Sequence, residues 1–367
     1  MYLLAFESSC DETAAAVIEA EGNRLRILSD IVASSADIHR LFGGVVPEIA
    51  SRAHSEVISG ITDEALKKAG VALEKIDAVA VTSHPGLIGA LLVGVNFAKS
   101  LALSRGIPLI PVNHILGHIA AAFFGAEPPK PPFLAFVVSG GHTALYRMID
   151  YHTPVLIGTT RDDAMGESFD KVGRLVGLPY PAGAGFDALA TEGFLQACGK
   201  TAGAGVSGEN APVSEAFAAF PKTAAARSMP LPSPALAGDT LDFSFSGPKT
   251  AAVNLLHRYT QNGTEPDRAL FAAAYTYTAV HAAAEKIAMA LSRYPGEELV
   301  LSGGVAANSH LRGQLRALCR RKGVRIHIPP RSLCGDNGAM IAAAGYYAYL
   351  AGERAGSDLN ASAADDL

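Results

Sequence analysis

The chain contains no tryptophan and few other aromatic residues or cysteines. Of its 367 residues, 7% are aromatic and four are cysteines, none of them in a CxxC pair. This low cysteine count favours a reducing, cytosolic compartment over a disulfide framework. The four are Cys10, Cys198, Cys319 and Cys334.

Targeting and membrane signals are also missing. The first residues, MYLLAFESSCDE, carry an acid at Glu7 and no basic region, so they do not resemble a signal peptide. The most apolar run, residues 86–103, is interrupted by two glycines, Asn96 and Lys99. It predicts a buried helix, and we therefore expect a cytoplasmic protein without a membrane span.

Positive charge does not dominate the chain. The 30 Lys and Arg residues are outnumbered by 35 Asp and Glu residues, which gives a formal net charge of −5. A basic footprint for nucleic acid over the whole chain is therefore absent, and such a contact needs a local patch or a partner. An exposed helix face is the favoured explanation of the candidate basic residues, which are Arg312, Arg316, Arg320, Arg321, Lys322 and Arg325.

Two common nucleotide-binding motifs do not occur. The chain has no GxxxxGK[ST] sequence, which excludes a P-loop protein. It also lacks GxGxxG near its start, which argues against a dinucleotide-dependent enzyme.

Apolar runs and helical spacings alternate in two similar halves. Each half opens with an apolar strand, a small polar loop and another strand, as in FESSCDETAAAVI and VVSGGHTALYRM. A proline-rich break at residues 125–132 separates the halves. We expect two α/β lobes, residues 1–130 and 131–350, with a poorly structured Ala/Gly/Pro-rich insertion near 193–240 and a flexible tail at 351–367. This duplication suggests a nucleotide bound in a cleft between the lobes.

Periodicity and turn residues define the individual elements. The predicted strands span residues 2–6, 14–18, 25–32, 76–82, 107–112, 133–138, 144–148, 155–160, 299–302 and 325–328. The predicted helices span residues 47–70, 87–104, 115–124, 166–175, 270–291, 307–322 and 338–350.

Three loops of small residues follow strands. Residues 8–10 (SSC) and 139–143 (SGGHT) lie at matching places in the two halves. Glycine lets the backbone approach an anion and N–H groups favour negative charge, so such loops can hold phosphate, although each alone also fits a plain turn. The third loop, residues 302–308 (SGGVAAN), opens a helix, and Asn308 can hydrogen-bond a ribose or base or simply begin that helix.

Two histidines, His114 and His118, are four residues apart in VNHILGH. On a helix they share one face, which suits two ligands of one metal ion but also two ordinary helical histidines. Asp336, in CGDNGAMIAAAG, is the candidate third ligand. Two imidazoles and one carboxylate suit Fe²⁺ or Zn²⁺ and leave positions open for substrate or water.

Carboxylates cluster in RDDAMGESFDK, at residues 161–171. They fit either the charged start and solvated face of a helix or, for Asp170, recognition of a ribose hydroxyl. Glu12, after the first loop, can act as a base, orient one or lie exposed. The residue chemistry leaves these alternatives open.

Nine motifs in one order resemble the tRNA N6-adenosine threonylcarbamoyltransferase family. They are FESSCDETAAAV, FGGVVPEIASRAH, GLIGALLVG, NHILGH, VSGGHTAL, FDKVGRLVGL, LDFSFSGPKTA, SGGVAANSHLR and GDNGAMIA. The resemblance covers residues 1–350 except the insertion. It implies a duplicated actin-like ATPase fold and transfer of threonylcarbamoyl from threonylcarbamoyl-adenylate to N6 of the tRNA adenosine immediately 3′ of the anticodon, with release of AMP.

The resemblance also implies roles for particular residues. The implied metal ligands are His114, His118 and Asp336, with one divalent ion per subunit, Fe²⁺ in preference to Zn²⁺. The residues implied at the adenylate are Val138, Ser139, Gly140, Gly141, His142, Asp170, Gly183, Asp187 and Asn308. Implied partners, besides tRNA, are a paralogous non-catalytic subunit with the same fold and a small ATPase.

The chain departs from the family pattern near the implied adenylate site. Ala182 and Ala184 stand where Gly and Pro are usual, whereas Gly183 and Asp187 remain. We expect Glu12 or His142 to serve as the general base. The alternative activity is that of an ATPase or small-molecule kinase of the same fold, although such kinases usually hold Mg²⁺ through carboxylates and phosphates rather than histidines.

Overall fold

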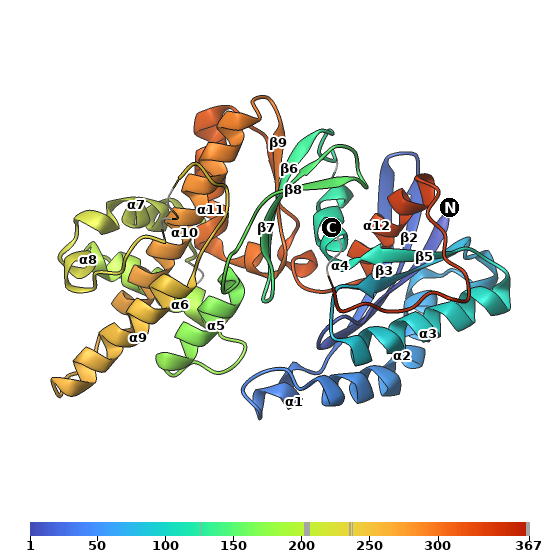
Figure 1. Cartoon of the computed structure of the whole chain (residues 1–367), viewed down its shortest axis with the longest axis horizontal. Helices are drawn as coiled ribbons and strands as arrows, with labels where there is room; N and C mark the ends of the chain where they lie inside the picture. Colours follow the sequence, from blue (N-terminus) through green and yellow to red (C-terminus); the bar gives the residue numbers. More distant parts are fainter. Residues whose placement is uncertain (126, 202–205, 235, 237, 365–367) are drawn as a thin grey trace. The chain divides into compact units, whose positions relative to one another are not determined.

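The structure consists of two units, each built on a five-stranded sheet, and the two sheets share one strand order (Figure 1). The computed structural model describes residues 1–125, 127–201, 206–234, 236 and 238–364. The first sheet has the order β3-β2-β1-β4-β5, and the second has the order β8-β7-β6-β9-β10. This repetition confirms the duplication that was expected from the sequence.

The two units interleave along the sequence. The first unit comprises Met1–Phe133, Met148–Val155 and Pro329–Leu367, and the second comprises Leu134–Arg147 and Leu156–Ile328.

Apolar runs form the sheet of the first unit. Its strands are β1 (Tyr2–Glu7), β2 (Glu12–Glu21), β3 (Arg24–Ser34), β4 (Ala78–His84) and β5 (Leu109–Asn113). β1 is antiparallel to β2 and parallel to β4, and β4 is parallel to β5. The first unit's helices and turns are α1 (Ala36–Arg40), α2 (Pro47–Ala69), η1 (Leu73–Lys75), α3 (Ile88–Arg105), α4 (His114–Ala120), η2 (Ala121–Phe124), η5 (Arg331–Leu333) and α12 (Gly338–Leu350).

Helices cover both faces of this sheet. Val79 and Val81 belong to the apolar core that α2 and α3 close on one face. Ala80, between them, faces the opposite way because side chains alternate along a strand. There α12 lies so close that a Cβ added at Gly345 would be 2.5 Å from the Ala80 Cβ. The sheet therefore separates α12 from α2 and α3, as Figure 1 shows.

Helix α3 contains residues 88–103 of the apolar run 86–103. Among the described residues it is the one helix long and apolar enough to cross a membrane. Its Leu91, Val95 and Ala98 side chains are fully buried in the first unit. The run thus forms a helix that covers the sheet, in agreement with the sequence.

The second unit repeats the sheet and adds a group of helices. Its strands are β6 (Phe133–Val138), β7 (Thr143–Met148), β8 (Pro154–Thr159), β9 (Glu298–Ser302) and β10 (Ile326–His327). Its helices are α5 (Met165–Leu175), α6 (Gly183–Ala197), α7 (Ala211–Ala219), η3 (Phe220–Lys222), α8 (Ala224–Ser228), α9 (Ser246–Gln261), α10 (Arg268–Arg293), η4 (Gly304–Ala307) and α11 (Ser309–Lys322).

The C-terminal segment differs from the sequence expectation. Residues 329–367 group with the first unit rather than with residues 131–350, because α12 packs on the first sheet. Residues 353–364 are not a loose tail. Ala355 pairs with Leu109 on β5, and the Ser362 N–H donates to the Ser83 carbonyl at 2.9 Å. Residues 365–367 of the expected tail lie outside the described residues.

The Ala/Gly/Pro-rich insertion near 193–240 also contains regular structure. It holds the end of α6 as well as α7, η3 and α8. Phe194 packs against Phe217 and Phe220 with ring centroids 5.0 and 5.2 Å apart. These few aromatic anchors organise a segment whose composition alone suggested little order. Residues 202–205, 235 and 237 of the insertion lie outside the described residues.

Candidate functional site

A side-chain cap sets the start of helix α4, which carries both histidines. The Asn113 side-chain oxygen accepts hydrogen bonds from the backbone N–H groups of Ile115 and Leu116, which caps the helix. α4 therefore starts at His114, and His118 follows one turn later on the same face. Both imidazoles are buried in the first unit, with 7% and 1% of their surface exposed.

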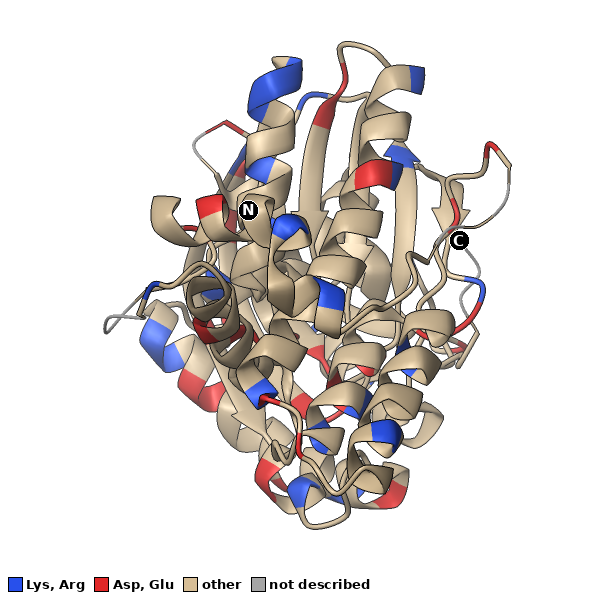
Figure 2. Cartoon of the chain, turned by 90° about the vertical axis from the view of Figure 1, so that its left-hand side faces the viewer, with Lys and Arg blue, Asp and Glu red and all other residues tan. Residues whose placement is uncertain are grey.

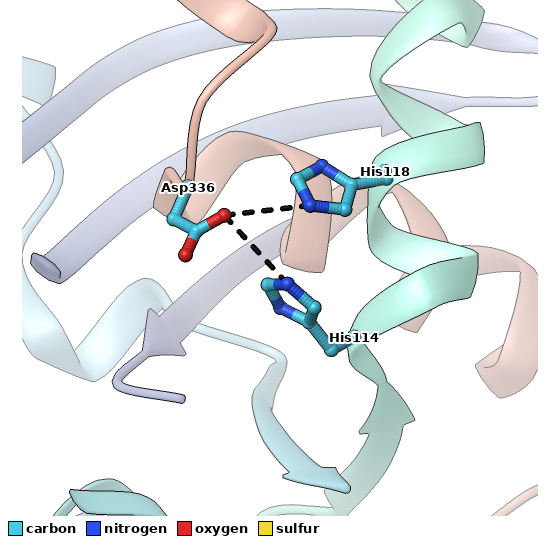
Figure 3. A group of neighbouring side chains, drawn as sticks. All are labelled: His114, His118 and Asp336. Carbon is cyan, nitrogen blue, oxygen red and sulfur yellow. Dashed lines mark ion pairs between the residues drawn. The ribbon is translucent and has the colours of Figure 1, made fainter. Parts of the chain in front are cut away.

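Asp336 reaches these histidines from the loop before α12. Its Oδ1 atom lies 3.6 Å from His114 Nε2 and 3.4 Å from His118 Nε2 (Figure 3). One donor atom from each residue lies within 4.8 Å of the others. Two metal–ligand bonds of about 2.0–2.2 Å span up to roughly 4.4 Å. The separations of 3.6 and 3.4 Å from Asp336 Oδ1 to the two imidazoles lie within that range, so one ion can bind Asp336 together with each histidine.

The chain that directly follows Asp336 is fixed by two side chains. Asn337 accepts the N–H of Met340 at 2.9 Å and caps α12. Asp30, on β3, accepts the N–H of Gly338 at 3.0 Å. Burial raises the pKa of Asp30, and the backbone N–H groups of Gly338 and Ala339 that donate to it oppose that rise. The carboxylate ligand is thus held by residues from two distant parts of the chain.

Negative charge accumulates around Asp336. Enclosure by the protein raises the pKa of Asp336 to about 6, His114 opposes the rise, and Glu7 and Asp11 add to it. Burial likewise raises the pKa of Glu12 to about 9, with contributions from Asp336 and Asp11. Such a concentration of carboxylates near two imidazoles favours a bound cation.

The first loop is packed rather than open. The Ser8 hydroxyl donates to the Ala90 carbonyl at 3.0 Å, and a Cβ at Gly86 would lie 2.7 Å from the Ser9 carbonyl oxygen. Ser9 Oγ lies 3.2 Å from His114 Nδ1. In the described structure this loop therefore supports the histidine–carboxylate group, instead of presenting its serine side chains to solvent.

Glu7 is a residue of this site that the sequence did not reveal. Its side chain is fully buried, and Oε2 lies 3.1 Å from His114 Nδ1. Burial favours a raised pKa for Glu7, but His114 and the hydrogen bonds from His114, Ser9 and Thr82 lower it. The available signal was an acidic residue at the end of an apolar strand. The sequence interpretation took Glu7 only as the residue at which the strand ends.

The glycine turn of the second unit closes on itself. The Ser139 N–H donates to the His142 carbonyl at 2.8 Å, and the His142 N–H donates to Ser139 Oγ at 3.1 Å. Gly140 and Gly141, between them, are exposed, and a Cβ on either would meet no described atom within 4 Å. The turn therefore leaves room for a ligand to approach the backbone.

The remaining residues implied at the adenylate form a connected chain in the second unit. Asp170 accepts the N–H of Ala182 at 2.8 Å, which places it at the start of α6 beside Gly183. One turn later Asp187 accepts the N–H of Ser309 at 3.0 Å. Neighbouring Asn308 caps α11 by accepting the N–H of Leu311 at 2.9 Å.

Val138 connects to the same region through the third glycine loop. A Cβ at Gly303 would lie 2.4 Å from the Val138 carbonyl oxygen, and Gly303 has a φ of 89°, which favours glycine. The end of β6 and the loop after β9 are therefore in backbone contact.

The two candidate bases lie in different units. Glu12 begins β2 in the first unit, where its Oε1 accepts the Ser34 hydroxyl at 3.1 Å. His142, half-buried, ends the glycine turn of the second unit.

Three of the six basic residues that could bind nucleic acid lie against acidic side chains, whereas Arg320, Arg321 and Lys322 are exposed at the end of α11. Arg312, buried, and Arg316 both pair with Glu209, and Arg325 lies 3.9 Å from Glu298. Figure 2 shows basic and acidic segments interspersed on this side of the chain. The pattern weakens the sequence hypothesis that these arginines bind nucleic acid together.

The duplicated sheet places the chain in the class of proteins with the actin-like ATPase fold. A solved structure of this class, full-length HypF in a phosphate- and nucleotide-bound form, matches with a TM-score of 0.54. The match covers 95% of this chain and 46% of that chain at 15% identity, and thus shows a shared fold alone.

Sequence comparison identifies the family within that class. The family model described as tRNA N6-adenosine threonylcarbamoyltransferase matches residues 26–343. The enzyme of that name from Anaeromyxobacter dehalogenans (strain 2CP-C) is 49% identical over 99% of this chain and 98% of its own length. The enzyme of that name from Moorella thermoacetica is 47% identical over 98% of this chain and 95% of its own length.

The chain belongs to the tRNA N6-adenosine threonylcarbamoyltransferase family. It transfers a threonylcarbamoyl group to N6 of an adenosine in tRNA. This confirms the transferase activity that the nine motifs implied, rather than the alternative activity of an ATPase or small-molecule kinase.

Proposed function

We propose that the donor is threonylcarbamoyl-adenylate, the acceptor is the adenosine immediately 3′ of the anticodon, and AMP is the leaving product. We propose further that His114, His118 and Asp336 hold one divalent cation for this reaction. The observation that carries the proposal is the convergence of these three ligands on one point inside the first unit. Sequence spacing alone did not require that convergence.

The donor set favours Fe²⁺, with Zn²⁺ as the second choice. Two imidazoles and one carboxylate suit both ions and leave coordination positions for substrate oxygens. When bound, the ion supplies Lewis-acid stabilisation of negative charge.

The chemistry demands mainly positioning from the protein. The adenylate is a mixed anhydride, so its carbamoyl carbon is already activated. Adenine N6 attacks that carbon, the bond from carbon to the phosphate oxygen breaks, and AMP leaves with the bonding electrons. The N6 proton passes to a base, for which Glu12 and His142 are the candidates. Holding donor and acceptor together supplies much of the rate enhancement.

The second unit is the proposed adenylate site. Exposed backbone at Gly140 and Gly141, within the turn from Val138 to His142, suits the phosphate. Asp170, Asp187 and Asn308 suit the ribose and base, with Gly183 at the start of α6. Ala182 is 1% exposed and already donates its N–H to Asp170, so the departure from the family pattern keeps this connection.

The proposed partners and location rest on membership of the family, not on a feature of the protein surface. We propose that the enzyme works in the cytoplasm with a paralogous non-catalytic subunit and a small ATPase. The net charge of −5 and the mixed charges of Figure 2 support a need for help in holding the tRNA anticodon loop.

The proposal is tested with His114→Ala and Asp336→Ala, and with His281→Ala as the matched control. His281 lies on α10 and pairs with Glu285 at the surface. Bound metal after gel filtration and transfer from the adenylate to an anticodon stem-loop are both measured. We expect the first two variants to lose metal and transfer, and the control to keep both. Retention of metal and full transfer by His114→Ala would refute the metal site.

A further inference from the structure

Glu7 presents a carboxylate in the interior of the first unit, at the end of β1. Its side chain is 0% exposed. Burying an ionised group is costly unless hydrogen bonds and an opposite charge compensate for it. A buried carboxylate in an otherwise apolar strand is therefore tolerated only because of the groups that contact it.

The Glu7 carboxylate meets three donors. The Ser9 N–H donates to Oε1 at 2.5 Å, and the Thr82 hydroxyl donates to Oε2 at 2.5 Å. The third contact joins Oε2 to His114 Nδ1 at 3.1 Å. The first two come from the loop after β1 and from β4, so they fix the direction of the carboxylate independently of the histidine.

Close packing keeps this arrangement in place. A Cβ at Gly86 would lie 2.7 Å from the carbonyl oxygen of Ser9, and one at Gly94 would meet the hydroxyl of Ser8. The loop after β1 therefore cannot shift without displacing α3 or the chain before it. Glu7 consequently has a fixed orientation toward the imidazole.

The contact determines which nitrogen of His114 carries the proton. A carboxylate accepts hydrogen bonds and does not donate them, so Nδ1 holds the hydrogen, which the Ser9 hydroxyl 3.2 Å away can accept as well. Nε2 then presents its lone pair toward Asp336, 3.6 Å away. A carboxylate behind a ligating histidine orients the ring and makes the ligand more basic.

We infer that Glu7 is a positioning residue for the metal ion, which fixes the tautomer and ring orientation of His114. This inference rests on the proposed metal site. It assigns a role in metal binding to a residue outside the three ligands.

The first test compares Glu7→Gln with Thr82→Val, using Co²⁺ as the probe. Both substitutions remove a hydrogen bond from the same buried cluster, but only the first removes the carboxylate behind His114. Co²⁺ affinity is measured by competition with a chelator, and the visible Co²⁺ spectrum and the thermal midpoint of the metal-free chain are recorded. We expect Glu7→Gln to bind Co²⁺ about 10–100-fold more weakly and with an altered spectrum. Thr82→Val should keep the spectrum and lose clearly less affinity than Glu7→Gln, because the carboxylate and its Ser9 N–H donor remain.

The outcomes separate this inference from the proposal on which it rests. Absence of Co²⁺ binding by the unaltered chain overturns the metal site and the role of Glu7 together. Normal binding by the unaltered chain, with equal affinity and an identical spectrum in Glu7→Gln, overturns only the role of Glu7. If Glu7→Gln and Thr82→Val lose equal Co²⁺ affinity, in proportion to the drop in their thermal midpoints, Glu7 has only a structural role. That result also overturns the inference.

A second measurement does not need a substitution at Glu7. In the Zn²⁺-loaded chain, nitrogen NMR of the histidine rings should show His114 with a protonated Nδ1 and a metal-bound Nε2, assigned with His114→Gln. Metal bound through Nδ1, or an Nδ1 without its proton, would contradict the inference even if Glu7→Gln failed to fold.

Discussion

A Cβ placed on Gly338 would lie 2.7 Å from the backbone nitrogen of Ala16. The start of α12 thus meets β2 through bare backbone, two residues after Asp336. Side-chain rotation cannot relieve that contact, because the facing atom belongs to the sheet.

Gly338→Ala should therefore destabilise the first unit. Overpacking of this kind costs about 1–3 kcal/mol, which exceeds the gain of about 0.5–1 kcal/mol from replacing glycine in a helix. The matched control is Gly335→Ala, where a Cβ meets no described atom within 4 Å. Urea denaturation of both variants checks the prediction, and equal midpoints would contradict it.

Asp187→Ala should weaken donor binding more than it weakens folding. Asp187 contributes one hydrogen bond to the Ser309 N–H, and its side chain is 19% exposed. If it also holds the donor ribose, the Km for the adenylate should rise about tenfold, equivalent to roughly 1.4 kcal/mol. Glu192→Ala, on an exposed position of the same helix, is the control. An unchanged Km in the presence of a lowered melting temperature would assign Asp187 a purely structural role.

Asp162 should be the main cap of α9. It accepts the N–H groups of Phe245 and Ser246 and the hydroxyls of Ser244 and Ser246. Loss of such a cap costs about 0.5–2 kcal/mol, so Asp162→Ala should lower the unfolding free energy by that amount and Asp162→Asn by less. Asp239→Ala, at a side chain that is 85% exposed, is the control. Chemical denaturation that shows no difference between Asp162→Ala and Asp239→Ala would count against the cap.

The same carboxylate gives a pH signature at acid pH. Burial works to raise the pKa of Asp162, but the four hydrogen bonds lower it below its ordinary value. The stability that it contributes is present above the unfolded pKa and is lost as pH falls through the folded one. The difference between the unaltered chain and Asp162→Ala should therefore shrink as the solution is acidified below about pH 4.

His310 should make stability depend on pH nearer neutrality. Burial lowers the pKa of His310, and Asp187 opposes this only in part. Below about pH 6.5 the unfolded chain therefore binds a proton at this histidine that the folded chain does not bind. The contribution of His310 to the free energy of unfolding is complete above that pH and falls as the pH drops toward the folded pKa. His310→Gln should flatten the slope of unfolding free energy between pH 7 and 5, and His281→Ala should not. Parallel curves for His310→Gln and the unaltered chain would rule out this role.

Several parts of the fold followed directly from the sequence. Continuous apolar runs such as Phe133–Val138 predicted buried strands, and the structure places β6 at those residues. The spacing of His114 and His118 predicted one helical face, and both reach the same oxygen of Asp336. These features depend on residues close in sequence, where the periodicity of helix and strand operates.

Other parts depended on contacts between distant residues. Asp336 is more than 200 positions from the histidines, and no local pattern reports their meeting; only the likeness to known motifs suggested it. Helices α6 and α9 were not predicted. Helices α7 and α8 were missed because their Ala-, Gly-, Ser- and Pro-rich segment suggested little order, whereas Phe217 of α7 packs on Phe194 with ring centroids 5.0 Å apart. The role of Glu7 needed the position of the His114 ring, which spacing does not contain.

The interleaving of the two units has a consequence for synthesis. The first sheet is made early, with β5 ending at Asn113, but α12, which covers one of its faces, begins only at Gly338. A ribosome must therefore complete the whole second unit while that face lacks its own helix. Asp336 emerges with the same late segment, so the three proposed metal ligands exist together only after the whole second unit has been made. In the proposed metal site, loading therefore has to wait for this late segment, and a chain cut before Asp336 should hold neither the helix nor the ion.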